Sequence, residues 1–487
     1  MHLLDLEKDI IPKIIKHLPF PADTSFPDMV KKHTTQIEKP NYIPFVKDLQ
    51  LFIEQQQREN LLEISKENVP PEILKSAVLF NIKSNDEIYS DNSSIRQRIP
   101  KGLCILKMNS HDDDDDIVIY ADRKCTGTNV NDDDSGDIDF NKYFLKRYCY
   151  THRIITLPEI DGDAFHFSVR FINDKFYLIV GNQNNHMLLG ERNDIRYYTK
   201  DEYKTTRNFA AALFDQLAEM DDDKRELLYN FLYHTKTTFL CQFIQGDAQH
   251  IVEYFVISRR IVFLTLTSHN QQESLTPFSV LIIERIIRFF LRLNTIYIDT
   301  SQHDGHFSIY ELRDSIRRKN YLMRGKVLYC EDVDGNTIGM IKIKTIKYIC
   351  LRALREITLR ILKQQQKILS WKKLVKCKYN EILSEFNLSK FYIDIWVYNG
   401  INFIKWIKNN MHCTKYGQIA YITNEQIISQ FPSIWDEFRF SNYVHARYID
   451  FPDLESINIR FISKMMDPLL PEMIDPLLPK SILSYSK

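Results

Sequence analysis

The chain has 487 residues and carries no net charge, with 64 Lys and Arg against 64 Asp and Glu. Its 44% hydrophobic and 12% aromatic residues supply apolar surface for two or three packed domains and argue against wholesale disorder. A neutral balance provides no global field for nucleic acid, so any basic surface has to be local.

Cysteine usage and hydropathy indicate the compartment. The eight cysteines are scattered, with no C-x-x-C pair and no His/Cys cluster at zinc spacing. The most apolar stretch, 278–293, contains four charged residues and predicts an amphipathic, mostly buried helix rather than a membrane span. We expect a reduced, intracellular protein, cytoplasmic or nuclear, without a membrane segment.

The first third of the chain predicts helices and then short strands. Residues 1–75 indicate helices joined by Pro-containing breaks, with apolar residues of 46–62 at helical spacing. Short strands are expected from Ala77 to Ile119, ending in the compact strand 117–120. The five carboxylates of Asp112–Asp116 repel one another and predict a solvated loop.

The middle of the chain predicts a second acidic loop, a hairpin and a helix. The loop is Asp132–Asp137. Residues 165–170 and 175–180 alternate as strands do, around the turn pair Asn173-Asp174. Residues 208–220 have helical period, and one face of that helix carries Phe209, Leu213 and Leu217.

The rest of the chain predicts strands and then helices. Residues 239–267 return to strands and 279–293 to a helix. Residues 326–330 and 338–344 predict a hairpin that turns at Asp334-Gly335. Helices dominate from Tyr348 onward. Two β-rich stretches separated and flanked by helices favour the α+β class over a βαβ alternation.

The end of the chain repeats Asp467-Pro-Leu-Leu-Pro471 as Asp475-Pro-Leu-Leu-Pro479. Repeated prolines exclude a helix or a central strand, so the segment is interpreted as a flexible tail or, alternatively, a docking motif. The expected division is a helical region 1–75, a core domain 76–360, a helical domain 361–465 and a Pro-rich tail 466–487.

Three motifs occur in a defined order between residues 115 and 360. The first is Ala121–Asn129 directly after a strand, similar to a K-x-D/T-G motif. The second is Thr238–Phe243, similar to an F-E-F strand. The third pairs Arg324–Tyr329 with Gly339–Tyr348, similar to E-G-x-V followed by K-x-K-x-x-x-Y. Together they resemble the ATP-dependent RNA ligases of the phage and fungal type, within the lysine-adenylylating nucleotidyltransferases.

The resemblance implies a fold and a reaction. The fold would be an ATP-grasp-like nucleotidyltransferase core of antiparallel sheets flanked by helices, with helical N- and C-terminal regions. The reaction would use ATP and Mg²⁺ or Mn²⁺: a lysine, here Lys124, takes AMP, passes it to an RNA 5′-phosphate, and a 3′-hydroxyl then displaces it. The implied partners are ATP and RNA ends.

The chemistry explains why lysines would gather at such a site. An amine attacks phosphorus only when unprotonated, and nearby cations lower its pKa. Lys342 and Lys344 lie one residue apart, so on a strand both project from one face, where they can meet phosphates or remain solvated. Gly127 would allow close backbone approach, and Arg123 would reach a phosphate or be a surface charge.

The sequence departs from the family at two carboxylate positions, which Gln242 and Arg324 occupy. Mg²⁺ is usually held by one or two carboxylates, so the metal is in question. Substitute ligands would be Glu331, Asp332 or the acids of 132–134, each of which is otherwise a solvated acid on a turn. The alternative function is therefore a degenerate member that binds nucleotide or RNA ends with weak or no catalysis.

A basic stretch follows the last motif. Residues 347–378 hold many Lys and Arg against the single acid Glu356, and this helical surface would track an RNA backbone or simply be a solvated face. Trp371 and Tyr379 are candidates for stacking on bases.

Overall fold

The computed structural model describes most of the chain. The described residues are 3–18, 25–108, 115–123, 143–245, 250–252, 254, 259–269, 274–293, 295, 299–304, 309–319, 323–364, 368–386, 388, 390–410 and 424–440. The Pro-rich repeats and the second acidic loop lie outside them.

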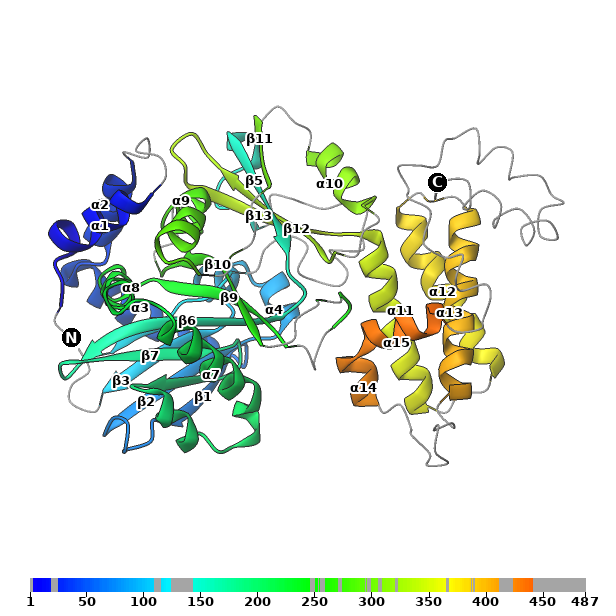
Figure 1. The fold of residues 1–487 in the computed structure, drawn as a ribbon, viewed down its shortest axis with the longest axis horizontal. Coiled ribbons are helices and arrows are strands. Elements are labelled where there is room, and N and C mark those ends of the chain that lie inside the picture. The colour runs from blue at the N-terminus through cyan, green and yellow to red at the C-terminus, as the bar shows by residue number, and fades with distance from the viewer. Residues whose placement is uncertain are drawn as a thin grey trace.

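Three antiparallel sheets form the centre of the molecule, and helices flank them (Figure 1). The first sheet has the order β1 (Glu63–Asn68), β2 (Ala77–Lys83), β3 (Leu103–Met108), β4 (Asp116–Ile119). The second has the order β10 (Arg260–Thr267), β9 (Thr238–Ile244), β6 (Asp163–Ile172), β7 (Lys175–Gly181), β8 (His186–Leu189). The third has the order β11 (Asp299–Asp304), β5 (Arg153–Glu159), β12 (Gly325–Glu331), β13 (Thr337–Lys344). The predicted α+β class with antiparallel sheets is confirmed.

The N-terminal region contains more than the predicted helices. A π-helical turn, Leu6–Ile10, leads into α1 (Ile11–His17), and α2 (Ser25–Gln36) and α3 (Lys39–Arg58) follow. Residues 63–68, expected to be helical, instead form β1, which pairs with β2 across the boundary expected at residue 75. The hydrogen bonds to β2 decide this conformation, because β1 itself has a largely polar sequence.

The stretch expected to hold only short strands also contains two helices, α4 (Asp86–Asp91) and α5 (Ser93–Arg98). Each begins after an asparagine cap: Asn85 Oδ1 accepts the N–H of Ile88, and Asn92 Oδ1 accepts the N–H of Ile95. Asparagine is among the favoured N-cap residues, so the two caps explain where these helices start.

The largest hydrophobic core is formed by the second sheet and the helices packed on it. The hairpin predicted around Asn173-Asp174 is confirmed as β6 and β7, and both turn residues have positive φ, as a two-residue hairpin turn requires. The helix α7 (Lys204–Ala218) buries Phe209, Leu213 and Leu217 as predicted, and α8 (Asp222–Thr235) packs against β6. The predicted helix 279–293 is present as α9 (Val280–Arg285) continuing into a π-helical turn, Ile286–Phe290.

The third sheet confirms the second predicted hairpin, because β12 pairs with β13 and the turn contains Gly335 at φ +79°. The helix α10 (Ile309–Arg317) packs on these two strands. Beyond β13 the helices form a separate bundle with its own hydrophobic core, seen to one side of the sheets in Figure 1. Its members are α11 (Ile346–Gln364), α12 (Ile368–Glu385), α13 (Lys390–Asn410), α14 (Asn424–Ser429) and α15 (Phe431–Phe440). Within the described ranges, no helix combines the length and apolarity needed to cross a bilayer.

Gly325 allows β12 and β13 to approach closely. A Cβ built at this position would lie 2.0 Å from the carbonyl oxygen of Ile343, a backbone atom that cannot move without shifting β13. We expect Gly325→Ala to lower the free energy of unfolding by about 1 to 3 kcal/mol, the usual cost of forcing extra atoms into packed structure. Chemical denaturation measures this, and an unchanged midpoint and slope would contradict it.

Candidate functional site

A cavity of about 480 Å³ lies between the second and third sheets. It is lined from β5, β6, β9, β12 and β13, by Arg324 just before β12, and by residues 121–123 just after β4. Ligand sites of small molecules typically fall in the range of about 300 to 1,000 Å³. The cavity is therefore large enough for a nucleotide-sized ligand.

Charged side chains from distant parts of the sequence meet in this cavity. Its cations are Lys101, Arg123, Arg324, Lys342 and Lys344, and its carboxylates are Asp122, Glu159 and Asp163. The predicted site residues Arg123, Gln242, Arg324, Lys342 and Lys344 thus line one cavity. The structure brings them together, while their roles in binding stay predictions.

The pair Lys342 and Lys344 occupies alternate positions of β13, so both line the cavity from one face of the sheet. The Lys344 side chain is nearly fully buried. Asp122 lies within electrostatic reach of Lys342: burial raises the pKa of the Asp122 carboxyl, and the charges of Lys342 and Lys101 only partly offset this rise. The Lys101 N–H also donates to the Asp122 carbonyl at 2.9 Å, which anchors the segment after β4 to this wall.

Several buried polar atoms of the lining have no hydrogen-bond partner among the described residues. Gln242 Oε1 and Arg123 Nε are an acceptor and a donor of this kind, and Glu159 Oε2 is another acceptor. A buried donor or acceptor left unpaired costs free energy, about 1 to 3 kcal/mol in typical cases. An acceptor and a donor that both border one cavity can instead be satisfied by a bound ligand.

Arg324 is held by two carboxylates. Its Nε lies 3.1 Å from Glu159 Oε1, and its Nη1 lies 3.5 Å from Asp161 Oδ1. Burial by itself would lower the pKa of the guanidinium, but Glu159, Tyr348 and Asp161 outweigh it, so the pKa is raised. Arg324 is therefore permanently charged and neutralised by its neighbours, and it adds no net positive charge to this wall.

Asp161 is fixed by contacts from three directions. Its Oδ2 accepts the N–H groups of Ile251 and Val252 at 2.8 and 2.9 Å, and its Oδ1 accepts the Tyr348 hydroxyl at 3.0 Å. The carboxylate has little capacity left for a further ligand. Its arrangement identifies it as a residue that positions Arg324.

An apolar wall completes the cavity. It consists of Leu157, Leu240, Leu264, Val327, Tyr329 and Met340. Cations on one side and apolar side chains on another match a ligand that carries both phosphate and a flat apolar ring.

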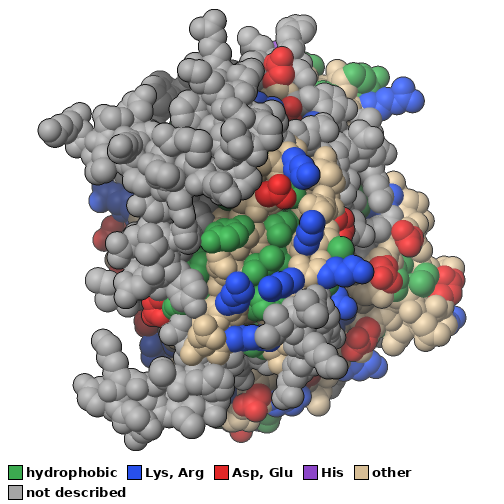
Figure 2. All heavy atoms as spheres, turned by 90° about the vertical axis from the view of Figure 1, so that its right-hand side faces the viewer, with side chains coloured by type: hydrophobic (Ala, Val, Ile, Leu, Met, Phe, Trp, Pro, Cys, Tyr) green, Lys and Arg blue, Asp and Glu red, His purple; other side chains and the backbone are tan. Residues whose placement is uncertain are grey.

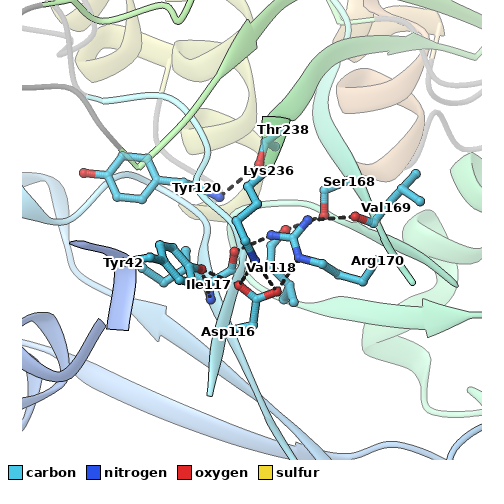
Figure 3. A network of polar contacts seen from close by, with 10 residues as sticks. All are labelled: Tyr42, Asp116, Ile117, Val118, Tyr120, Ser168, Val169, Arg170, Lys236 and Thr238. Carbon is cyan, nitrogen blue, oxygen red and sulfur yellow. Dashed lines mark hydrogen bonds and ion pairs between the residues drawn. The ribbon is translucent and has the colours of Figure 1, made fainter. Parts of the chain in front are cut away.

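A polar network fixes β4 and Tyr120, which directly precede the segment 121–123 (Figure 3). Asp116 pairs with Arg170 of β6 at 2.6 Å, with Lys236 at 3.1 Å, and with the Tyr42 hydroxyl. The Tyr120 N–H donates to Thr238 Oγ1 at 3.1 Å. These contacts join the first sheet to the second just before the chain enters the cavity.

The network corrects the prediction that Asp112–Asp116 is a solvated loop. Asp116 belongs to a strand and has only 20% of its side chain exposed, because Arg170 of β6 and Lys236, in the turn between α8 and β9, compensate its charge. Asp115 pairs with Lys107 at 2.8 Å and is also mostly buried. Asp112 to Asp114 lie outside the described residues.

Lys124 and Gly127 lie outside the described residues as well. The three residues that precede Lys124 line the cavity. The predicted nucleophile therefore follows the lining directly in sequence, and its role stays a prediction.

The alternative metal ligands do not belong to the cavity. Glu331 is fully buried, where it pairs with Arg153 and accepts the Ser279 hydroxyl at 2.9 Å. Asp332 pairs with Lys146 at 2.7 Å and accepts backbone N–H groups of its own turn. Both are buried and paired with cations, so the interpretation of them as solvated acids is wrong, and neither lies where it could contact a ligand in the cavity. The acids of 132–134 fall outside the described part.

The described lining fits a magnesium ion poorly. Glu159 is paired with Arg324, and Asp163 contacts His250 at 3.0 Å. Across the described residues, no group of three or more His, Cys, Asp or Glu side chains is arranged to hold a metal. A metal at this site would depend mainly on the phosphates of its ligand.

Trp371 and Tyr379 are not stacking platforms. They are 1% and 0% exposed and belong to the core of the helical bundle, where the Tyr379 hydroxyl donates to the Cys350 carbonyl at 3.2 Å. Lysines nevertheless remain on the bundle surface, among them Lys373, Lys376 and Lys405. Figure 2 shows Lys and Arg side chains gathered around apolar ones on this side of the molecule.

The sequence analysis missed part of the lining. Lys101, Glu159 and Asp163 border the cavity, and Asp161 supports it. The Asp161-Gly162 pair shortly after β5 was an available signal, because D-G also ends the K-x-D-G motif.

No protein-family model matches the chain, and no curated protein does either. Among solved structures, an archaeal ATP-dependent RNA ligase is similar with a TM-score of 0.40 and 10% identity, over 69% of this chain and 74% of that one. An RNA ligase of Naegleria gruberi, solved with PPi, is similar with a TM-score of 0.26 and 11% identity, over 41% of this chain and 51% of that one. Similarities at this level do not establish a family.

Proposed function

We propose that the cavity binds ATP and that the protein is an RNA ligase-like nucleotidyltransferase. The observation that carries this proposal is the meeting of Arg123, Lys342 and Lys344 in one cavity with an apolar wall. Arg123 lies in the first motif and Lys342 and Lys344 lie in the third, and the order of these motifs resembles that of the ligases. The sequence pattern and the spatial arrangement therefore support the same function.

The arrangement suggests how ATP is held. Lys342 and Lys344 contact the phosphates, because two ammonium groups on one strand face suit a polyanion. Arg123 Nε and Gln242 Oε1, which have no hydrogen-bond partner among the described residues, meet a phosphate oxygen and a ribose hydroxyl. The purine lies against the apolar wall.

The proposal has two forms, each favoured by a specific observation. In the first, Lys124 attacks the α-phosphate and AMP then passes to an RNA 5′-phosphate; the placement of residues 121–123 in the lining supports it. In the second, the protein binds nucleotide or RNA ends without turnover. The neutralised Arg324 and the uncharged Gln242, at positions where the ligases have carboxylates, support this form.

Labelling with α-³²P-ATP in Mg²⁺ or Mn²⁺ tests the proposal together with equilibrium ATP binding. A labelled protein band that disappears in Lys124→Ala supports the first form. ATP binding without label under both metals supports the second. Failure of ATP to bind at all rejects the proposed function.

The lysines of the helical bundle are the proposed contact for RNA. We expect Lys373→Glu with Lys376→Glu to weaken binding of a 5′-phosphorylated RNA oligonucleotide and to reduce the slope of log affinity against log salt by roughly 1 to 2, since each phosphate contact releases condensed cations. Filter binding at several salt concentrations measures this. An unchanged slope would assign RNA binding to another surface or to none.

A further inference from the structure

Glu159 and Arg324 face each other across two neighbouring strands of the cavity wall. The strands β5 and β12 pair antiparallel, with Gly325 opposite Glu159, and Arg324 directly precedes Gly325. Both side chains line the cavity, and their charged groups are 3.1 Å apart. The two residues therefore form one unit of the site although they are 165 positions apart in sequence.

Each of these residues occupies a charged position of a motif with its sign inverted. Glu159-Ile-Asp-Gly162 begins at the last residue of β5 and matches K-x-D-G except at its first residue. Arg324-Gly-Lys-Val327 leads into β12 and matches E-G-x-V except at its first residue. In sequence these are two unrelated departures. In the structure Glu159 and Arg324 form an ion pair. The pair therefore keeps one positive and one negative charge, but the acid stands at the position of the motif's lysine and the cation at the position of the motif's glutamate.

The surroundings hold this exchanged pair in place. Glu159 is 7% exposed, and its Oε2 has no hydrogen-bond partner among the described residues. The guanidinium also lies over the Tyr348 ring, 5.7 Å from its centre, and Tyr348 in turn donates to Asp161. A guanidinium stays protonated in proteins and is no nucleophile, so neither member of the pair can supply the amine that forms a phosphoramidate.

We propose that Glu159 and Arg324 occupy the covalent centre of the cavity with exchanged charges, so that this protein holds ATP there without becoming adenylylated. This inference rests on the proposed function and selects its non-covalent form. Lys124 is then not a nucleophile, and the cavity acts as a nucleotide-binding site.

Exchanging the charges back tests the inference. In Glu159→Lys/Arg324→Glu, the introduced amine is positioned to attack the α-phosphorus of ATP: an N–P bond forms, the bond from the α-phosphorus to the bridging oxygen breaks, pyrophosphate leaves with the electron pair, and the amine proton passes to solvent. The matched control is Glu159→Arg/Arg324→Glu, which restores the same charges without a nucleophilic amine.

Each protein is first titrated with ATP and then incubated with α-³²P-ATP and Mg²⁺. We expect no label on the wild-type protein or on the control, and at least tenfold more label on the lysine variant, retained when Lys124→Ala is added. Label on the wild-type protein that Lys124→Ala removes would overturn the inference, as would a lysine variant that binds ATP as the wild type does and stays unlabelled. If the wild-type protein does not bind ATP in the titration, the proposed function itself is rejected.

Discussion

Replacing both lysines of β13, Lys342→Ala with Lys344→Ala, is expected to weaken ATP binding by about 10² or more. A hydrogen bond to a charged group contributes about 1.5 to 3 kcal/mol, and each 1.4 kcal/mol is a tenfold change in affinity. Both side chains line the cavity from one face of the strand. Isothermal titration of ATP into the two proteins measures the difference.

Lys326 provides a matched control on the same hairpin. It lies opposite Ile343 in the register, so it projects from the other face of the sheet, and it is buried as Lys344 is. Lys326→Ala should leave ATP affinity within about twofold of the wild type, because the lost charge is outside the cavity. Equal losses from both variants would mean that general destabilisation, not phosphate contact, explains the effect.

The largest effect on stability is expected at Asp116. Removing one partner of a buried ion pair costs about 3 to 5 kcal/mol, since the other charges are left uncompensated. In Asp116→Ala those charges are Arg170, which is 4% exposed, and Lys236. Chemical denaturation should show a loss in this range, whereas Asp215→Asn, which breaks a pair exposed by more than half on both sides, should cost less than about 1 kcal/mol.

Asp116 also predicts a pH dependence. Burial alone would raise the pKa of this carboxyl, but Arg170, Lys236 and the Tyr42 hydroxyl outweigh it and hold the pKa well below its ordinary value. A group whose pKa is lowered by folding stabilises the protein above its unfolded value of about 3.9 and loses that contribution as the pH falls further. Below about pH 4 the wild type should therefore lose stability more steeply than Asp116→Asn. Parallel curves would contradict this role.

Local signals in the sequence were sufficient for much of the fold. The turn pairs Asn173-Asp174 and Asp334-Gly335 located both hairpins, because the turn residues and the alternation beside them act over a few positions. Helical periodicity located α7 in the same way. By contrast, β1 is polar and owes its conformation to its partner β2, which a helical interpretation of residues 1–75 did not take into account.

The parts of the site that were missed depend on contacts distant in sequence. Lys342 and Lys344 were identifiable because the period of a strand alone puts them on one face. Asp116 was misinterpreted because the two cations that compensate its charge, Arg170 and Lys236, lie 54 and 120 positions away in sequence. Glu159 was likewise missed because its partner Arg324 is brought next to it only by the pairing of β5 with β12.

The central claim, that ATP binds between β5, β9, β12 and β13, is tested most directly by photolabelling with 8-azido-ATP followed by peptide mapping. The azido group sits on the purine, so the adducts should fall on peptides that contain the apolar wall, around Leu157, Val327 and Met340, and excess ATP should remove them. Adducts confined to the helical bundle α11–α15, or adducts that excess ATP does not displace, would contradict the claim.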